Sequence, residues 1–238
     1  MIRRPPRSTL DRSSAASDVY KRQKKEGRFM PDITLEVRRI PKPGKDFEVA
    51  QLVIEGVKGS NSRAVVTGSA LTAHTGQRDI VSAFVLSSWD ELEEIHHNFL
   101  TNEDFRNKVS EIDELCVKAS TIQGLNVLVR GDFSGTPKYM RRNFLVAKRG
   151  ESAAVADTLL EWREAFPEGK RPTVQRGAAG NIDMVRVTAS YESLNALMEA
   201  SADVATNPAY EKFRGQINRL TSRVNGYNSR ILHVNQPQ

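Results

Sequence analysis

One stretch of the sequence occurs twice, and this repetition constrains the fold more than any other feature. Each copy begins with an aspartate and an apolar run typical of a strand, in residues 79–112 (DIVSAFVLSSWDELEEIHHNFLTNEDFRNKVSEI) and 183–217 (DMVRVTASYESLNALMEASADVATNPAYEKFRGQI). Each then continues as a long helical pattern, which is interrupted by Thr-Asn and followed by an aromatic residue, Phe105 or Tyr210. Internal repetition of this kind predicts two copies of one structural unit.

The flanking segments extend the repetition, with corresponding positions separated by 102 to 109 residues. In the first copy, strand patterns at 33–40, 63–71, 80–86 and 122–130 enclose helical patterns from 46 and from 89. Each copy therefore has the order βαββαβ, which is the ferredoxin-like arrangement. We predict a first repeat over 32–130, a turn-rich linker over 131–138 and a second repeat over 139–235.

A four-stranded sheet with both helices on one face leaves its other face uncovered. The strand that contains Val81, Phe84 and Val85 has apolar residues on both faces, so neither face is suited to water. Two such units can cover each other and close an eight-stranded barrel. The expected fold class is α+β, with two βαββαβ repeats that form an intrachain α/β barrel. Alternatively, each half pairs with a half of a second chain, so both a monomer with a pseudo-dimeric barrel and a homodimer stay open.

Residues 1–23 are set apart because their codons, written back to DNA, resemble sequencing-library adapters at both ends of the segment. We expect a non-native, disordered tail, with native sequence beginning at or after Lys24 and Met30 as the first plausible start. The formal charge falls from +6 to +2 when the six Lys/Arg and two acidic residues of this segment are removed, and to 0 from Met30 onward. The basic balance that would suggest a nucleic-acid or membrane partner therefore belongs to the tail.

The remaining composition is that of an ordinary globular protein. Cys116 is the only cysteine, so no internal disulfide can form, and this fits a reducing compartment such as the cytoplasm. No apolar run approaches the roughly 20 residues of a membrane-spanning helix. We predict a cytoplasmic protein with no nucleic-acid partner and no membrane partner.

The Asn-x-x-aromatic segments (Asn102 to Phe105 and Asn207 to Tyr210), with the preceding strand and helix, resemble the dimeric α/β-barrel superfamily in tandem form. They are similar to antibiotic-biosynthesis-monooxygenase-like and NIPSNAP-like domains. The resemblance covers nearly all of 33–234 and implies a fold group rather than one activity. In its haem-degrading members the ligating histidine follows the helix aromatic by four residues. That position is Val109 in one half and Arg214 in the other, so we predict no haem and no other cofactor.

No nucleophile elbow, phosphate-binding loop or dinucleotide fingerprint is present in the sequence. His96 and His97 are adjacent on a helix and point about 100° apart, so we predict no metal site. Cys116 lies on an apolar helix face and is interpreted as a packed small side chain rather than a nucleophile.

Two function classes are consistent with these observations. The first is a protein that binds a small apolar or aromatic molecule between its sheets, and it includes a cofactor-independent monooxygenase as the resemblance implies. The second is a non-catalytic structural or protein-interaction domain with a filled barrel. The catalytic candidates are His74 and Asn143, and the ligand-binding candidates are Trp89, Tyr139, Arg141, Arg176 and Tyr191. A cavity of about 300 Å³ or more would favour the first class, and a packed interior the second.

Overall fold

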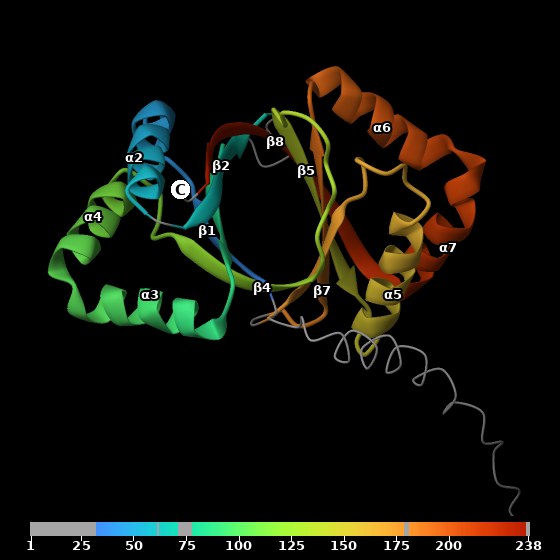
Figure 1. The fold of residues 1–238 in the computed structure, drawn as a ribbon, viewed down its shortest axis with the longest axis horizontal. Helices are drawn as coiled ribbons and strands as arrows, with labels where there is room; N and C mark the ends of the chain where they lie inside the picture. The colour runs from blue at the N-terminus through green and yellow to red at the C-terminus, as the bar shows by residue number, and fades with distance from the viewer. Residues whose placement is uncertain (1–31, 61, 71–77, 179–180, 237–238) are drawn as a thin grey trace, which may run out of the picture. The chain divides into compact units, whose positions relative to one another are not determined.

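Eight antiparallel strands form the centre of the structure and close into one barrel (Figure 1). The computed structural model describes residues 32–236, except 61, 71–77 and 179–180. These residues belong to one unit that begins at Asp32. The predicted α+β class and the closed barrel are confirmed, and the barrel closes within a single chain. In the described ranges no helix has the length and apolar content needed to cross a bilayer.

Each half contains a strand, a helix, two strands, a divided helix and a final strand. The first half contains β1 (Ile33–Arg39), α2 (Asp46–Lys58), β2 (Arg63–Ser69), β3 (Ile80–Leu86), α3 (Trp89–Thr101), α4 (Glu103–Glu114) and β4 (Thr121–Val129). The second half contains β5 (Tyr139–Ala147), α5 (Ser152–Arg163), β6 (Thr173–Gly177), β7 (Met184–Tyr191), α6 (Leu194–Thr206), the short 3-10 helix η1 (Pro208–Tyr210), α7 (Glu211–Leu220) and β8 (Thr221–Asn235).

The strand order around the barrel is β1-β3-β2-β8-β5-β7-β6-β4. The first half therefore runs β4-β1-β3-β2 and the second runs β8-β5-β7-β6. The two halves meet where β2 pairs with β8 and where β4 pairs with β6, and the register shifts at both of these seams. Such shifts are typical of β-bulges, which increase the local twist that a closing sheet needs.

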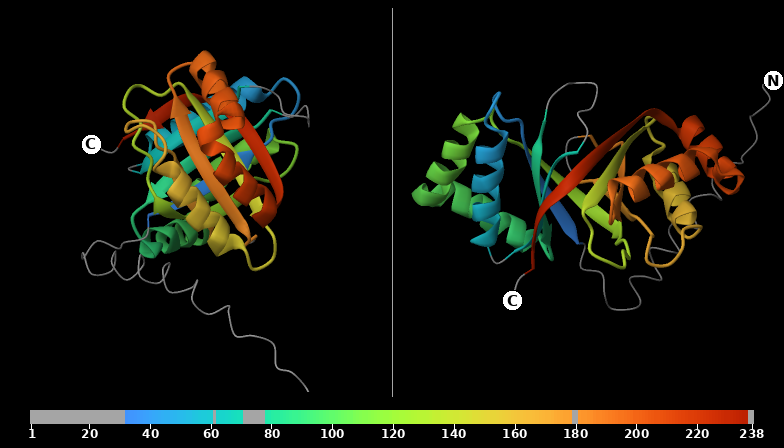
Figure 2. Two further views of the ribbon diagram at one scale, coloured as in Figure 1. Left: turned by 90° about the vertical axis from the view of Figure 1, so that its right-hand side faces the viewer. Right: turned by 90° about the horizontal axis from the view of Figure 1, so that it is seen from above.

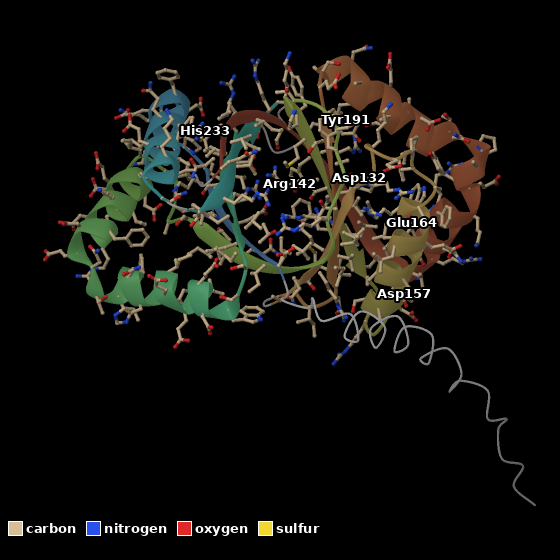
Figure 3. The ribbon with its side chains drawn as sticks, viewed as in Figure 1. Asp132, Arg142, Asp157, Glu164, Tyr191 and His233 are labelled. Carbon is tan, nitrogen blue, oxygen red and sulfur yellow. The ribbon has the colours of Figure 1, made fainter. Side chains whose placement is uncertain are left out.

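Helices lie on two opposite sides of the barrel, with α2, α3 and α4 on one side and α5, α6 and α7 on the other (Figure 2). Because side chains alternate along a strand, each strand presents one face to these helices and the other to the barrel interior. Leu145 and Ala147 of β5, for example, pack in an apolar cluster with Val155 and Leu159 of α5. Arg142 of the same strand is on the opposite face and lies inside the barrel (Figure 3).

The apolar core is therefore divided between the outer faces of the sheet. One cluster lies beneath α5 and α7, and two smaller clusters lie beneath α2 and α3. Val81 and Val85 of β3 are on the interior face, whereas Phe84 packs outward against the helix-side clusters. The interior face also carries charged residues that the apolar pattern does not predict.

The repeated Thr-Asn-x-x-aromatic motif forms a helix cap. The Asn102 side chain accepts a hydrogen bond from the Phe105 backbone N–H at 3.0 Å, which starts α4 one residue after α3 ends. Asn207 accepts from the Ala209 N–H at 2.9 Å between α6 and η1. The Asn side chain thus satisfies a backbone donor that a helix start leaves unpaired, and it breaks each long helical pattern in two.

The two helix pairs differ in how well they are buried. In the second half, α6 and α7 bury Leu197, Phe213 and Ile217. Trp162 of α5 stacks on Phe213 there, with ring centroids 5.7 Å apart. The corresponding helices of the first half, α3 and α4, are described in full and bury no residue. The helix layer of the first half is consequently the more exposed one.

Candidate functional site

A carboxylate between two guanidinium groups lies inside the barrel. Glu36 of β1 has one carboxylate oxygen 2.5 Å from Nη1 of Arg186 on β7 and the other 3.3 Å from Nε of Arg142 on β5. Glu36 is 6% exposed, Arg186 is 2% exposed and Arg142 is 4% exposed, so the ion cluster is almost entirely shielded from solvent. Removing ions from water is costly, and it requires mutual compensation of this kind.

Hydrogen bonds connect the cluster to the surrounding strands. Arg186 Nε donates to the Gln175 side-chain oxygen at 2.8 Å, and Gln175 Nε2 donates to the Thr34 hydroxyl at 2.7 Å. Arg142 Nη1 donates to the hydroxyl oxygens of Thr67, at 3.1 Å, and Ser229, at 3.3 Å. Strands from both halves of the barrel therefore hold the guanidinium groups in fixed orientations.

The cluster carries one positive charge in excess, because two arginines face one carboxylate. Burial alone would raise the pKa of Glu36, but attraction to Arg186 and Arg142 outweighs burial and lowers the pKa below its ordinary value. Burial lowers the pKa of Arg142, and Glu36 opposes that change. An arginine stays protonated at neutral pH even when buried. The site is therefore cationic.

Some donors of the cluster have no acceptor. Several buried atoms of the cluster have no hydrogen-bond partner among the described residues, and two of them, Arg142 Nη2 and the Thr188 hydroxyl oxygen, have no ion-pair contact there either. Arg142 and Thr188 lie directly opposite each other on β5 and β7. Their side chains consequently leave the sheet side by side on its interior face. Buried polar atoms are nearly always paired, so two adjacent unpaired groups indicate a place for a ligand or ordered water.

A cavity of about 230 Å³ adjoins these groups. Its lining contains both apolar side chains and members of the polar cluster, and comprises Thr34, Glu36, Val65, Ala83, Val85, Val127, Arg130, Gly131, Met140, Arg142, Thr173, Gln175, Arg186 and Thr188. Arg130 and Gly131, which are exposed, mark the side toward solvent. The cavity volume is smaller than the roughly 300 Å³ expected of a pocket that binds a small molecule. It exceeds the roughly 150 Å³ in which a buried cavity of another protein binds benzene.

Four of the predicted site residues are brought together, but on the outer face of the sheet. Arg141 Nε donates to the Asn143 side-chain oxygen at 3.0 Å, and Arg141 Nη1 donates to the Ser201 hydroxyl of α6 at 3.0 Å. Tyr139 and Tyr191 are register partners at the same end of β5 and β7. Burial raises the pKa of Tyr191, and Arg141 opposes that change. This group lies on the helix side, away from the barrel cavity.

The other predicted residues are dispersed. Trp89 is the first residue of α3 and is 47% exposed. Arg176 faces outward and donates to the Ser152 hydroxyl at the start of α5, at 2.7 Å. His74 lies outside the described residues. Cys116 is 3% exposed and packs in the cluster beneath α2.

The positions where a haem ligand would be expected do not fit such a group. Arg214 Nη1 donates to the backbone carbonyls of Val204, at 3.0 Å, and Asn207, at 2.8 Å, so its side chain joins α7 to the end of α6. Val109 has no ligating atom. Within the described part of the chain, no group of three His, Cys, Asp or Glu side chains is arranged to hold a metal ion.

Sequence reasoning missed Glu36, Arg142 and Arg186. The available signal was a charged residue inside an otherwise apolar strand, as in TLEVRR, YMRRNFL and MVRVTAS. An isolated charge in a buried strand usually has a charged partner, because an unpaired buried ion is too costly.

Several solved structures share this fold. A candidate monooxygenase from Fusobacterium nucleatum superimposes with a TM-score of 0.68 and 8% identity, covering 88% of this chain and 96% of that one. An anthrone oxidase-like protein gives 0.62 and 14%, covering 86% and 93%. A candidate monooxygenase from Lactobacillus acidophilus gives 0.59 and 11%, covering 87% and 97%. Chlorite dismutase from Candidatus Nitrospira defluvii gives 0.50 and 9%, covering 90% and 95%.

At these identities the likeness shows a common fold. No protein-family profile matches the sequence, and no curated protein sequence matches it. The chain is thus an α/β-barrel protein with monooxygenase-like structural neighbours.

Proposed function

We propose that the barrel interior binds a small aromatic molecule and that the protein is a cofactor-independent monooxygenase acting on it. The observation that carries this proposal is the cavity of about 230 Å³, whose lining includes apolar side chains as well as the Arg142–Glu36–Arg186 cluster. Apolar side chains are suited to contact an aromatic ring, and a nearby positive charge is suited to a ring that ionises.

The proposed chemistry uses electrons of the substrate itself. A ring methylene next to a phenolic system reacts with one O2; one oxygen atom becomes the new carbonyl and the other leaves as water. Such a substrate must first be activated by losing a proton to solvent. A nearby positive charge favours the ionised form of a phenol, so the guanidinium of Arg142 would lower the substrate's pKa. The same charge would stabilise negative charge that develops on the substrate oxygen.

The size of the cavity narrows the substrate. Pockets for drug-sized ligands are typically about 300 Å³ or larger. At about 230 Å³ this cavity suits one or two rings better than three. We therefore propose a compact phenolic compound rather than a large polyketide.

The structural neighbours support the reaction class only indirectly. Two are candidate monooxygenases and one is anthrone oxidase-like, but all are between 8% and 14% identical to this chain. Because one fold can host many reactions, the site residues rather than the fold must carry the argument.

We also propose that the two halves arose by duplication of one βαββαβ unit. The same strand order in both halves and the equivalent caps at Asn102 and Asn207 support this origin. The NIPSNAP-like relationship, the cytoplasmic location and the absence of a cofactor stay predictions. So does the choice between a monomer and a homodimer.

A second candidate function is a protein-interaction domain. The exposed apolar side chains of α3 favour it, because Trp89, Phe99 and Leu100 are 47%, 46% and 71% exposed. Exposed apolar surface of this kind is typical of contact sites between proteins.

Oxygen uptake with a panel of small phenols that carry a ring methylene, and with the larger anthrones, tests the enzyme proposal. We expect uptake with one- or two-ring compounds, and we expect the Arg142→Met variant to lose it while its far-ultraviolet circular dichroism stays native. The Arg141→Met variant changes the neighbouring arginine on the outer face and should retain full activity. Absence of both uptake and binding across the panel would remove the enzyme proposal and leave the interaction domain.

A further inference from the structure

We propose that the barrel interior recognises a carboxylate, and that its ligand is a small aromatic monocarboxylate held by Arg142 and Thr188. This inference rests on the proposed small-molecule site, but it does not depend on oxygenation. The inference concerns the carboxylate group of the ligand, whereas the proposed oxygenation concerns its aromatic ring.

The first observation is the set of unpaired donors. Arg142 lines the cavity and is 4% exposed, and its buried Nη2 has no hydrogen-bond partner in the described structure. The hydroxyl of Thr188, directly opposite on β7, is likewise buried and unpartnered in that region. A carboxylate has two acceptor oxygens in one plane, so it can accept from both groups at once.

The second observation is the charge. Arg186 Nη1 lies 2.5 Å from one Glu36 oxygen, whereas Arg142 Nε lies 3.3 Å from the other, so Arg186 is the nearer counter-charge of Glu36. Arg142 is the surplus cation, because Glu36 can neutralise only one guanidinium. A monoanion makes the buried site neutral, whereas a phosphate monoester with nearly two negative charges would leave an uncompensated negative charge.

The third observation is the apolar part of the cavity lining. Val65, Val85, Val127 and Met140 line the cavity and offer no charged group. They are suited to a ring or a short aliphatic body attached to the carboxylate. A cavity of about 230 Å³ accommodates benzoate, since about 150 Å³ already accommodates benzene in another protein.

The test compares benzoate with benzamide, which has the same shape without the charge. Binding of each compound to the protein is measured by isothermal titration calorimetry and by ligand-observed nuclear magnetic resonance. We expect benzoate to bind at least about tenfold more tightly, the ratio that one charge-assisted hydrogen bond supplies. The preference should persist at high salt, because buried charges are screened much less than exposed ones.

Three variants locate the site. Arg142→Met should remove the preference for benzoate, and Thr188→Val should reduce it several-fold while preserving the shape of the side chain. Arg141→Met should leave it unchanged, because Arg141 lies on the other face of the same strand. Thr188→Val keeps the test decisive if Arg142→Met does not fold.

Equal binding of benzoate and benzamide, loss of binding in Arg141→Met alone, or benzoate binding abolished by moderate salt would overturn the carboxylate inference. Benzoate binding without oxygen uptake on any phenol would uphold this inference and contradict the monooxygenase proposal. Turnover of uncharged phenols without benzoate binding would uphold the monooxygenase proposal and contradict the carboxylate inference.

Discussion

Glu36 of β1 and Arg142 of β5 meet inside the barrel with 3.3 Å between a carboxylate oxygen and the guanidinium Nε, although the two residues belong to different halves of the chain. The hydrogen bond from Gln175 of β6 to Thr34 of β1 makes a second connection of the same kind. The two halves are thus joined by a polar centre as well as by backbone pairing at β2–β8 and β4–β6.

Removing the carboxylate should be strongly destabilising. Glu36→Gln leaves two buried guanidinium groups without a counter-charge, and breaking a buried ion cluster in this way costs about 3–5 kcal/mol. The measurement is the free energy of unfolding from denaturant titration. Glu48→Gln is the control, because Glu48 forms an exposed pair with Lys45 at 2.6 Å and such pairs contribute under about 1 kcal/mol. Equal effects of the two substitutions would contradict the structural role given to Glu36.

The same carboxylate predicts how stability depends on pH. Burial favours a higher pKa for Glu36, but its two arginines more than offset burial and lower the pKa below the ordinary value of 4.5. A lowered folded-state pKa contributes stability that is fully present above the unfolded pKa and is lost as pH falls through the folded value.

We therefore expect the stability difference between the native sequence and Glu36→Gln to be constant above about pH 5 and to shrink as acid is added below about pH 4.5. Denaturant titrations of both proteins across this range measure it. A difference that grows on acidification would mean that Glu36 is not ionised in the folded protein.

The sequence predicts the order of strands and helices because hydrophobic periodicity and turn residues report local structure directly. It does not predict the interior cluster, because alternation shows that neighbouring residues face opposite sides without showing which side is inside. Arg141 and Arg176 are predicted site residues, but both face the helices. Their neighbours Arg142 and Gln175 face the cavity. The inward face is decided by where the helices pack, and this depends on contacts between distant segments.

The repeated asparagine of the helix motif predicts a local effect on stability. Asn102→Ala removes the side-chain acceptor for the Phe105 N–H and should lower the free energy of unfolding by about 1 kcal/mol. Asn107→Ala is the matched control, because Asn107 is an exposed residue inside α4 and alanine is the better helix former. The control should be neutral or slightly stabilising. If both variants lose the same stability, the asparagine does not act as a cap.

The surplus arginine should be dispensable for folding, in contrast to Glu36. Arg142→Met leaves Glu36 paired with Arg186 at 2.5 Å, so the remaining buried charges are balanced. The variant loses the hydrogen bonds to Thr67 and Ser229, which contribute about 1 kcal/mol each, and regains part of that through an apolar side chain that needs no desolvation. We expect a free energy of unfolding within about 1–2 kcal/mol of the native value, well above that of Glu36→Gln. A loss as large as that of Glu36→Gln would mean that both arginines are needed to neutralise the carboxylate, and the cluster would then have no spare charge for a ligand.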